Sequence, residues 1–125
     1  MGKKKSRILI VDDEVVIRET IKKILVDEGF EVLSAENGIS AFSIVENNEI
    51  DIALLDIRMP DINGVELLEK IKVVNPGIKA IMMTGYEVES LVNDAFSQGA
   101  HACLHKPFEI NKLLEIFEEL GPKNE

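Results

Sequence analysis

The sequence predicts an α/β protein in which helices cover both faces of an open, parallel, doubly wound sheet. Two observations predict this class. Short apolar runs alternate along the chain with longer stretches whose apolar residues recur at helical spacing. The connections between them are short, so right-handed crossovers join parallel strands in one sheet. In such folds, ligands bind outside the carboxyl ends of the strands.

Five short segments are predicted to be strands because each is an apolar run bounded by polar or turn-forming residues. The first, RILIV, is unbroken and rich in branched residues, which is typical of a strand buried on both faces. The last, HACLH, is interpreted as an edge strand. In chain order, the expected strands cover residues 7–11, 31–35, 51–55, 79–83 and 101–105.

Five helices are predicted from apolar spacing and from the turn signals that end it. The first helix has its apolar residues on one face and ends at Gly29. The third ends at the turn 75–77, because the proline there cannot continue a helix. Gly99 closes the fourth. The expected helices extend to about residue 28 and then over about 39–46, 64–74, 87–97 and 109–120.

Length and composition restrict the class of protein. The 125 residues fit one domain, and we expect an ordered core at 7–120 between a basic leader (1–6) and a tail (121–125). The 23 acidic and 14 basic residues give a net charge of −9, which disfavours direct binding to nucleic acid. The longest apolar runs have four residues, too short to span a membrane. The single Cys103 cannot form an intrachain disulfide, so we expect a reducing, cytoplasmic location.

Chemically active side chains follow four of the expected strands. Asp12 and Asp13 follow the first, Asp56 the third, Thr84 the fourth and Lys106 the fifth. A parallel fold gathers these positions at one edge of the sheet. Neighbouring carboxylates repel unless a hard cation neutralises them, and an all-oxygen ligand set indicates Mg²⁺ or Mn²⁺. An aspartate, a metal ion, a lysine and a hydroxyl are the groups that phosphoryl transfer to a carboxylate requires.

Each of these residues also has a plainer explanation. Asp12 or Asp13 could cap the first helix, but one cap accounts for one aspartate and not for the adjacent pair together with Asp56. Thr84 is unremarkable after a strand, and Lys106 alone is typical of a solvated surface. Their joint occurrence at four strand ends favours a functional site.

Four segments of the sequence resemble the motifs of the response-regulator receiver domain family. They are VDDE at 11–14, DIRMPDING at 56–64, MTG at 83–85 and KPF at 106–108. The resemblance extends from about residue 7 to 120. It implies a flavodoxin-like fold with strand order 2-1-3-4-5, and a switch in which a histidine kinase or phosphotransfer protein phosphorylates Asp56. Slow self-catalysed dephosphorylation would reset this switch, so we do not expect a conventional enzyme.

The resemblance also implies roles for the residues at the strand ends. Asp13 and Asp56 would ligate Mg²⁺, which Mn²⁺ can replace, and Asp12 would act directly or through a water molecule. The backbone carbonyl of Arg58 would be the third protein ligand. Thr84 would bind a phosphoryl oxygen.

Lys106 has a role of its own in this resemblance. It would pair with Asp56 or with its phosphate. Pro107 would follow a cis peptide bond, which is a feature largely confined to proline, and this bond would aim the lysine.

The residues that tune and report phosphorylation include one departure from the family. The side chains of Arg58 and Tyr86 would flank the phosphoryl group and tune attack by water. The family usually has Tyr or Phe three residues before the lysine, but here that residue is Cys103. A thiol cannot sweep the same volume, so the aromatic part of the switch is in question, and Tyr86 is a candidate to take part of it. His101, Cys103 and His105 share one face of a strand, but steps of about 7 Å are too long to close around one zinc ion.

The expected partners are a sensor histidine kinase or histidine phosphotransfer protein, and an output domain or effector that the sequence does not name. Val15 and Val16, beside the active edge, are candidates for contact with a kinase helix pair; ordinary packing is the alternative. We expect a monomer, or a dimer on phosphorylation. Two other classes stay open. In a magnesium-dependent aspartyl phosphatase a second acid would stand where Arg58 stands, and a receiver-fold binding module that works without phosphorylation is favoured only by Cys103.

Overall fold

The computed structural model describes residues 6–85 and 89–120. The strands are β1 (Arg7–Val11), β2 (Glu31–Ala35), β3 (Ile52–Asp56), β4 (Lys79–Thr84) and β5 (Ala102–His105). They form one sheet in the order β2-β1-β3-β4-β5, and every neighbouring pair is parallel. The predicted doubly wound α/β class and the strand order that the resemblance implied are both confirmed.

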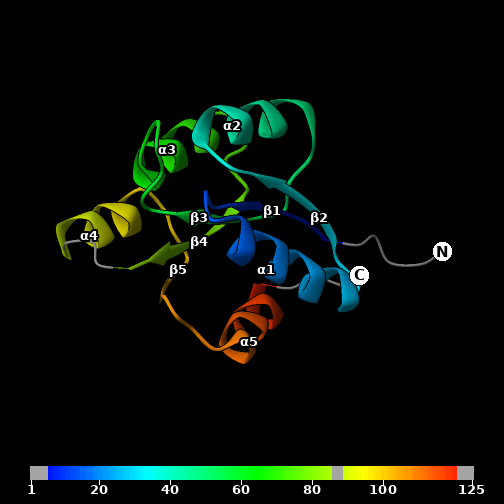
Figure 1. The fold of residues 1–125 in the computed structure, drawn as a ribbon. Helices are drawn as coiled ribbons and strands as arrows, with labels where there is room; N and C mark the ends of the chain where they lie inside the picture. Colours follow the sequence, from blue (N-terminus) through cyan, green and yellow to red (C-terminus); the bar gives the residue numbers. More distant parts are fainter. Residues whose placement is uncertain (1–5, 86–88, 121–125) are drawn as a thin grey trace.

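Helices cover both faces of this sheet (Figure 1). They are α1 (Val15–Asp27), α2 (Gly38–Asn47), α3 (Gly64–Val74), α4 (Glu89–Ser97) and α5 (Ile110–Leu120). Leu9 and Val11 of β1 belong to one apolar cluster, which includes residues of α2, α3 and α4. Ile8 and Ile10 belong to a second cluster, which includes residues of α1 and α5. Because side chains alternate along a strand, one apolar run supplies both cores, and polar groups are left to the ends of the strands.

Two strands extend one residue further than predicted. Asp56 is the last residue of β3 and pairs in register with Met83, and Thr84 is the last residue of β4 and pairs with His105. The end of a strand depends on pairing with its neighbours as well as on its own apolarity. Both residues therefore have backbones that are fixed by the sheet.

Other element ends differ from the prediction by one or two residues. Helix α2 begins at Gly38 because the side chain of Asn37 caps it, accepting a hydrogen bond from the backbone N–H of Ser40 at 2.8 Å. The predicted start of the fourth helix, and the proposed leader and tail, lie wholly or partly outside the described residues. Within the described ranges, no helix is both long and apolar enough to cross a membrane.

Backbone hydrogen bonds continue from the sheet into the segments that carry polar residues. The N–H of Asp12 donates to the carbonyl of Ala35 at 3.2 Å, and the N–H of Lys106 donates to that of Thr84 at 2.7 Å. The peptide bond between Lys106 and Pro107 is cis. The residues just beyond β1 and β5 are therefore held to neighbouring strands at the carboxyl edge of the sheet.

Candidate functional site

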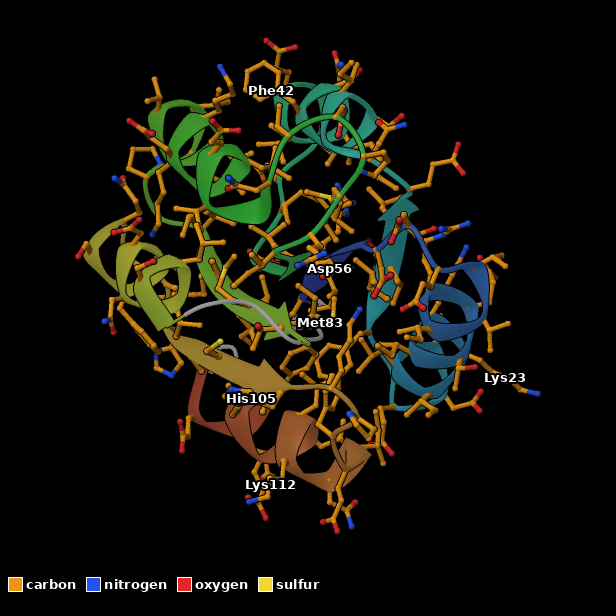
Figure 2. All side chains as sticks on the ribbon, turned by 60° about the vertical axis from the view of Figure 1, so that its left-hand side comes forward. Lys23, Phe42, Asp56, Met83, His105 and Lys112 are labelled. Carbon is orange, nitrogen blue, oxygen red and sulfur yellow. The ribbon has the colours of Figure 1, made fainter. Side chains whose placement is uncertain are left out.

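Three aspartates lie together at the carboxyl edge of the sheet. Asp12 and Asp13 follow β1, Asp56 ends β3, and these two strands are neighbours. One carboxylate oxygen from each lies within 4.8 Å of the other two. Asp12 and Asp56 are buried, whereas Asp13 is exposed. Figure 2 shows Asp56 at the centre of this edge, far from Lys23 and Lys112 at the periphery.

Lys106 supplies a positive charge to this cluster. Its Nζ lies 2.9 Å from Oδ2 of Asp12, 3.1 Å from Oδ2 of Asp56 and 3.4 Å from Oε1 of Glu14. Burial lowers the pKa of the Lys106 ammonium, but its hydrogen bond with Asp12 and its attraction to Asp56 outweigh burial and hold the pKa above its usual value. The lysine is therefore a permanent cation that bridges carboxylates from two strands.

Asp56 is less acidic than an ordinary aspartate. Burial and the nearby charge of Asp12 raise its pKa to about 6, although Lys106 and the backbone N–H of Arg58 oppose the shift. The N–H of Arg58 donates to Oδ1 of Asp56 at 3.2 Å. One lysine therefore compensates the buried carboxylates only in part, and a further cation would stabilise the ionised form.

The buried carboxylate of Asp12 indicates where such a cation would bind. Oδ1 of Asp12 accepts a hydrogen bond from the N–H of Glu14 at 2.9 Å. Oδ2 is buried and lies 2.9 Å from Nζ of Lys106, an ammonium that it shares with Asp56 and Glu14. Three clustered carboxylates beside one ammonium leave negative charge uncompensated, and this all-oxygen donor set fits a hard divalent cation such as Mg²⁺, which takes oxygen ligands and keeps some of its waters.

The loop between β3 and α3 begins directly after Asp56, and hydrogen bonds close it tightly. The N–H of Ile57 donates to the carbonyl of Met83 at 3.0 Å, and the N–H of Gly64 donates to that of Ile57 at 2.8 Å. Gly64 lies against the backbone of Asp56 with no room for a Cβ. The side chain of Asn63 caps α3 by accepting from the N–H of Glu66 at 2.9 Å. Asn63 and Gly64 therefore fix the path by which the chain leaves the site.

The remaining predicted residues lie at different places. Thr84 is buried at the end of β4, next to the strand that ends at Asp56. Cys103 is half-buried and packs against the cluster that includes α2, α3 and α4. Tyr86 lies outside the described residues.

His101, just before β5, and His105, at the end of β5, do not form a metal-binding cluster with Cys103. His101 is exposed, and its Nε2 lies 3.5 Å from Oε1 of Glu119 in α5. His105 is exposed at the end of β5. Across residues 6–85 and 89–120, three ligand-type side chains meet only at the aspartate cluster.

Two residues near the site that form hydrogen bonds with its segments were not singled out from the sequence. The guanidinium of Arg18 in α1 donates to the backbone carbonyl of Asp12 at 2.7 Å. Asp61, in the loop after β3, accepts hydrogen bonds from the N–H groups of Gly38 and Ile39 at 3.0 and 2.9 Å. The first of these bonds is the main reason why the pKa of Asp61 lies below its usual value. The spacing of Arg18, six residues after Asp12, was an available signal, whereas nothing in the sequence pattern linked Asp61 to residue 38.

The fold and the site together define a doubly wound α/β protein with an acidic, lysine-bridged cluster at the carboxyl edge of its sheet. The chain belongs to the response regulator receiver domain family, which it matches over residues 8–118. Receiver domains of this family bind Mg²⁺ at an acidic pocket. They act in phosphorylation-based signalling, typically as switches rather than as conventional enzymes.

Individual relatives cover almost the whole chain. Sporulation initiation phosphotransferase F of Bacillus subtilis is 33% identical over 117 residues, which are 94% of each chain. Chemotaxis protein CheY of Bacillus subtilis is 40% identical over 114 residues, which are 90% of this chain and 95% of that protein. The crystal structure of a CheY-like receiver domain protein from Methanospirillum hungatei has a TM-score of 0.90, with 42% identity and 94% coverage of each chain. The family resemblance seen in the sequence is confirmed.

Proposed function

We propose that residues 7–120 form a single receiver unit that accepts a phosphoryl group on Asp56 from a histidine kinase or histidine phosphotransfer protein. The observation that carries this proposal is the position of Asp56, buried at the end of β3, with its Oδ2 3.1 Å from Nζ of Lys106 and beside Asp12 and Asp13. A carboxylate with a fixed cation and an adjacent acidic cluster is suited to attack phosphorus once a metal balances the charge.

The transfer breaks the bond between phosphorus and the imidazole nitrogen of the donor. That nitrogen keeps the electron pair, and a carboxylate oxygen of Asp56 forms the new bond to phosphorus. Asp12, Asp13, Asp56 and the carbonyl of Arg58 would hold Mg²⁺, which when bound supplies positive charge to the carboxylates and phosphoryl oxygens. Lys106, already beside Asp56, would form an ion pair with an oxygen of the transferred phosphoryl group. Water attack on phosphorus would later release phosphate and restore the carboxylate.

Phosphorylation would then shift the conformation of the output surface. Thr84 ends the strand beside β3, so its hydroxyl is a candidate to bind a phosphoryl oxygen once one is present. A group that gains partners only in the phosphorylated state biases a pre-existing equilibrium. Cys103 in place of an aromatic residue would make the response of β5 differ from that of most relatives.

The donor would dock on the edge that carries the site. Val15 and Val16 begin α1, two residues after Asp13, and these residues are 56% and 73% exposed. Adjacent exposed valines beside a reactive carboxylate suit an apolar helical partner. The output partner is a separate domain or protein, and a sequence whose single cysteine, Cys103, cannot form an intrachain disulfide supports a cytoplasmic location for the exchange.

The proposal is tested with a small acyl phosphate donor and MgCl₂, followed by intact-protein mass spectrometry. We expect a gain of one phosphate that disappears on addition of EDTA before the donor and in the variant Asp56→Ala. Asp51→Ala, which removes an exposed aspartate at the opposite end of β3, is the matched control and should be phosphorylated like the wild type. A mass gain that survives Asp56→Ala would refute the assignment of Asp56.

A further inference from the structure

One carboxylate links the loop after β3 to a helix that is distant in sequence. Oδ1 of Asp61 accepts from the N–H of Gly38 at 3.0 Å and Oδ2 accepts from the N–H of Ile39 at 2.9 Å. Oδ1 also accepts from the N–H of Ile62 at 2.8 Å. Asn37 caps the next N–H of the helix, so the first turn of α2 is satisfied partly from outside its own segment.

The contact between the loop and α2 requires glycine at position 38. A Cβ at Gly38 would lie 2.6 Å from Cγ1 of Ile62 and 3.3 Å from Oδ1 of Asp61. Only glycine lets the loop approach the start of α2 this closely. The link is therefore a fitted contact between a loop and a helix and not merely the cap of a helix end.

The loop held in this way is the one that leaves the candidate metal site. Its ends are fixed by the hydrogen bond from Ile57 to Met83 and by the hydrogen bond from Gly64 to Ile57. Between these ends, Asp61 ties the loop to another layer of the fold. Arg58, whose carbonyl is the candidate third ligand, lies three residues before Asp61. A residue that holds the loop also limits the directions in which that carbonyl can point.

We propose that Asp61 is a positioning residue for the metal site, whose attachment to α2 holds the loop so that the Arg58 carbonyl complements Asp13 and Asp56. The inference rests on the proposed function, because it takes Mg²⁺ as the bound ion. It assigns the effect to hydrogen bonding and not to the charge of Asp61. By linkage, binding of Mg²⁺ should in turn stabilise the hydrogen bonds of Gly38 and Ile39, although neither residue is a ligand.

The test is calorimetric titration of MgCl₂ into the unphosphorylated chain, with three variants. We expect Asp61→Ala to weaken Mg²⁺ binding on the order of tenfold, the lower end of the effect of removing a group that orients a ligand. Asp61→Asn loses the same charge and the hydrogen bond from Ile39, but its amide oxygen can still accept from the N–H of Gly38, so it should recover part of the affinity. Asp51→Ala removes an exposed aspartate that accepts from the N–H of Arg7 at the opposite edge, and should bind like the wild type.

Amide hydrogen exchange gives a readout that does not depend on phosphorylation. In the wild type, Mg²⁺ should slow exchange at Gly38 and Ile39. In Asp61→Ala, that response should vanish while circular dichroism still shows a folded chain.

Three outcomes would overturn the inference. Wild-type affinity in Asp61→Ala removes the positioning role, and equal losses in Asp61→Ala and Asp61→Asn show that the hydrogen bond from Gly38 does not hold the loop. Absence of Mg²⁺ binding by the wild type refutes the magnesium site of the proposed function and this inference with it. In the first two cases the wild type still binds the ion, so the proposed function stands.

Discussion

Nζ of Lys106 lies 3.1 Å from Oδ2 of Asp56, and the same ammonium lies 2.9 Å from Oδ2 of Asp12. One cation therefore faces two buried carboxylates, and the pKa of Asp56 still rises to about 6, because burial and the charge of Asp12 outweigh the lysine. The side chains of the site carry excess negative charge inside the fold. Its stability, its affinity for metal and its reactivity should all depend on how that charge is balanced.

Neutralising Asp56 should stabilise the metal-free protein at neutral pH. Its folded pKa lies above the ordinary aspartate value of 3.8, so ionisation favours the unfolded chain. The loss of folding stability caused by ionised Asp56 is absent below about pH 3.8, the pKa in the unfolded chain. It grows as the pH rises and is complete above about pH 6, the pKa in the folded chain. We expect Asp56→Asn to raise the free energy of unfolding by about 2 kcal/mol at pH 7.5, since one pKa unit corresponds to about 1.4 kcal/mol and solvent screens part of it.

Urea unfolding in EDTA at pH 7.5 and pH 4 measures this difference. The gain should shrink strongly at pH 4, where most of Asp56 is protonated in the folded protein. Asp27→Asn, an equal charge change at the exposed end of α1, should show no such gain. A variant that is less stable than the wild type at pH 7.5 would contradict the raised pKa.

Removing the charge of Lys106 should tighten the binding of Mg²⁺. The ammonium occupies the carboxylate oxygens that the ion would use, so metal and lysine compete for the same negative charge. A unit charge about 4 Å away is worth about 1 kcal/mol or more, and we expect Lys106→Met to raise the affinity by roughly tenfold. Calorimetric titration should be performed at pH 8.5, because loss of the lysine raises the pKa of Asp56 further.

Lys106→Arg retains the positive charge and serves as the control, with an affinity close to that of the wild type. Phosphorylation of Lys106→Met should nevertheless slow, since the lysine no longer faces the transferred group. Weaker Mg²⁺ binding by Lys106→Met would show that the lysine assists metal binding, contrary to the competition inferred from its position.

Gly64 should tolerate substitution far less well than its small size suggests. A Cβ at this position would collide with the backbone carbonyl of Asp56, and it would lie 3.0 Å from the Cα of Ile57. Backbone atoms cannot move aside as a flexible side chain can, so we expect Gly64→Ala to destabilise the fold by about 1–3 kcal/mol. Gly77→Ala, whose Cβ would meet only Oδ1 of Asn75 at 3.8 Å, is the matched control.

Both glycine variants should be compared by chemical denaturation and by phosphorylation with an acyl phosphate. Gly64→Ala should lose stability and react more slowly, because the displaced backbone carries Asp56. Equal stability of the two variants would show that the loop after β3 shifts freely.

The parallel topology explains why so much of the site could be predicted. Lys106 and Asp12 are 94 positions apart, yet both follow strands of one parallel sheet, so their approach follows from the alternation of apolar runs and helices. The prediction ended two strands one residue too early, before Asp56 and before Thr84. Apolarity stops at these residues, but their pairing with Met83 and His105 extends the strands.

Contacts between loops left no comparable signal. Asp61 and Gly38 are 23 residues apart, and neither periodicity nor a capping pattern joins them, because the cap comes from a different segment. The packing of a loop on a helix depends on whether the surfaces fit. Here the fit requires that Gly38 has no Cβ, because Ile62 fills that space.

The exposed valines at the start of α1 should affect transfer from a protein donor and not transfer from a small molecule. The double variant Val15→Ser, Val16→Ser removes apolar surface beside the site without adding charge. Side chains this exposed contribute little to stability, so the free energy of unfolding should change by about 0.5 kcal/mol or less for each substitution. A phosphorylated histidine kinase or phosphotransfer protein that transfers to the wild type should transfer at least about tenfold more slowly, since each buried valine contributes about 1.5 kcal/mol. Phosphorylation by an acyl phosphate should stay near the wild-type rate.

Val26→Ser, at the other end of α1, is the control and should match the wild type in both reactions. An unchanged rate of transfer from the protein donor to the double variant would exclude Val15 and Val16 from the docking surface, because their apolar surface would then contribute nothing to the encounter.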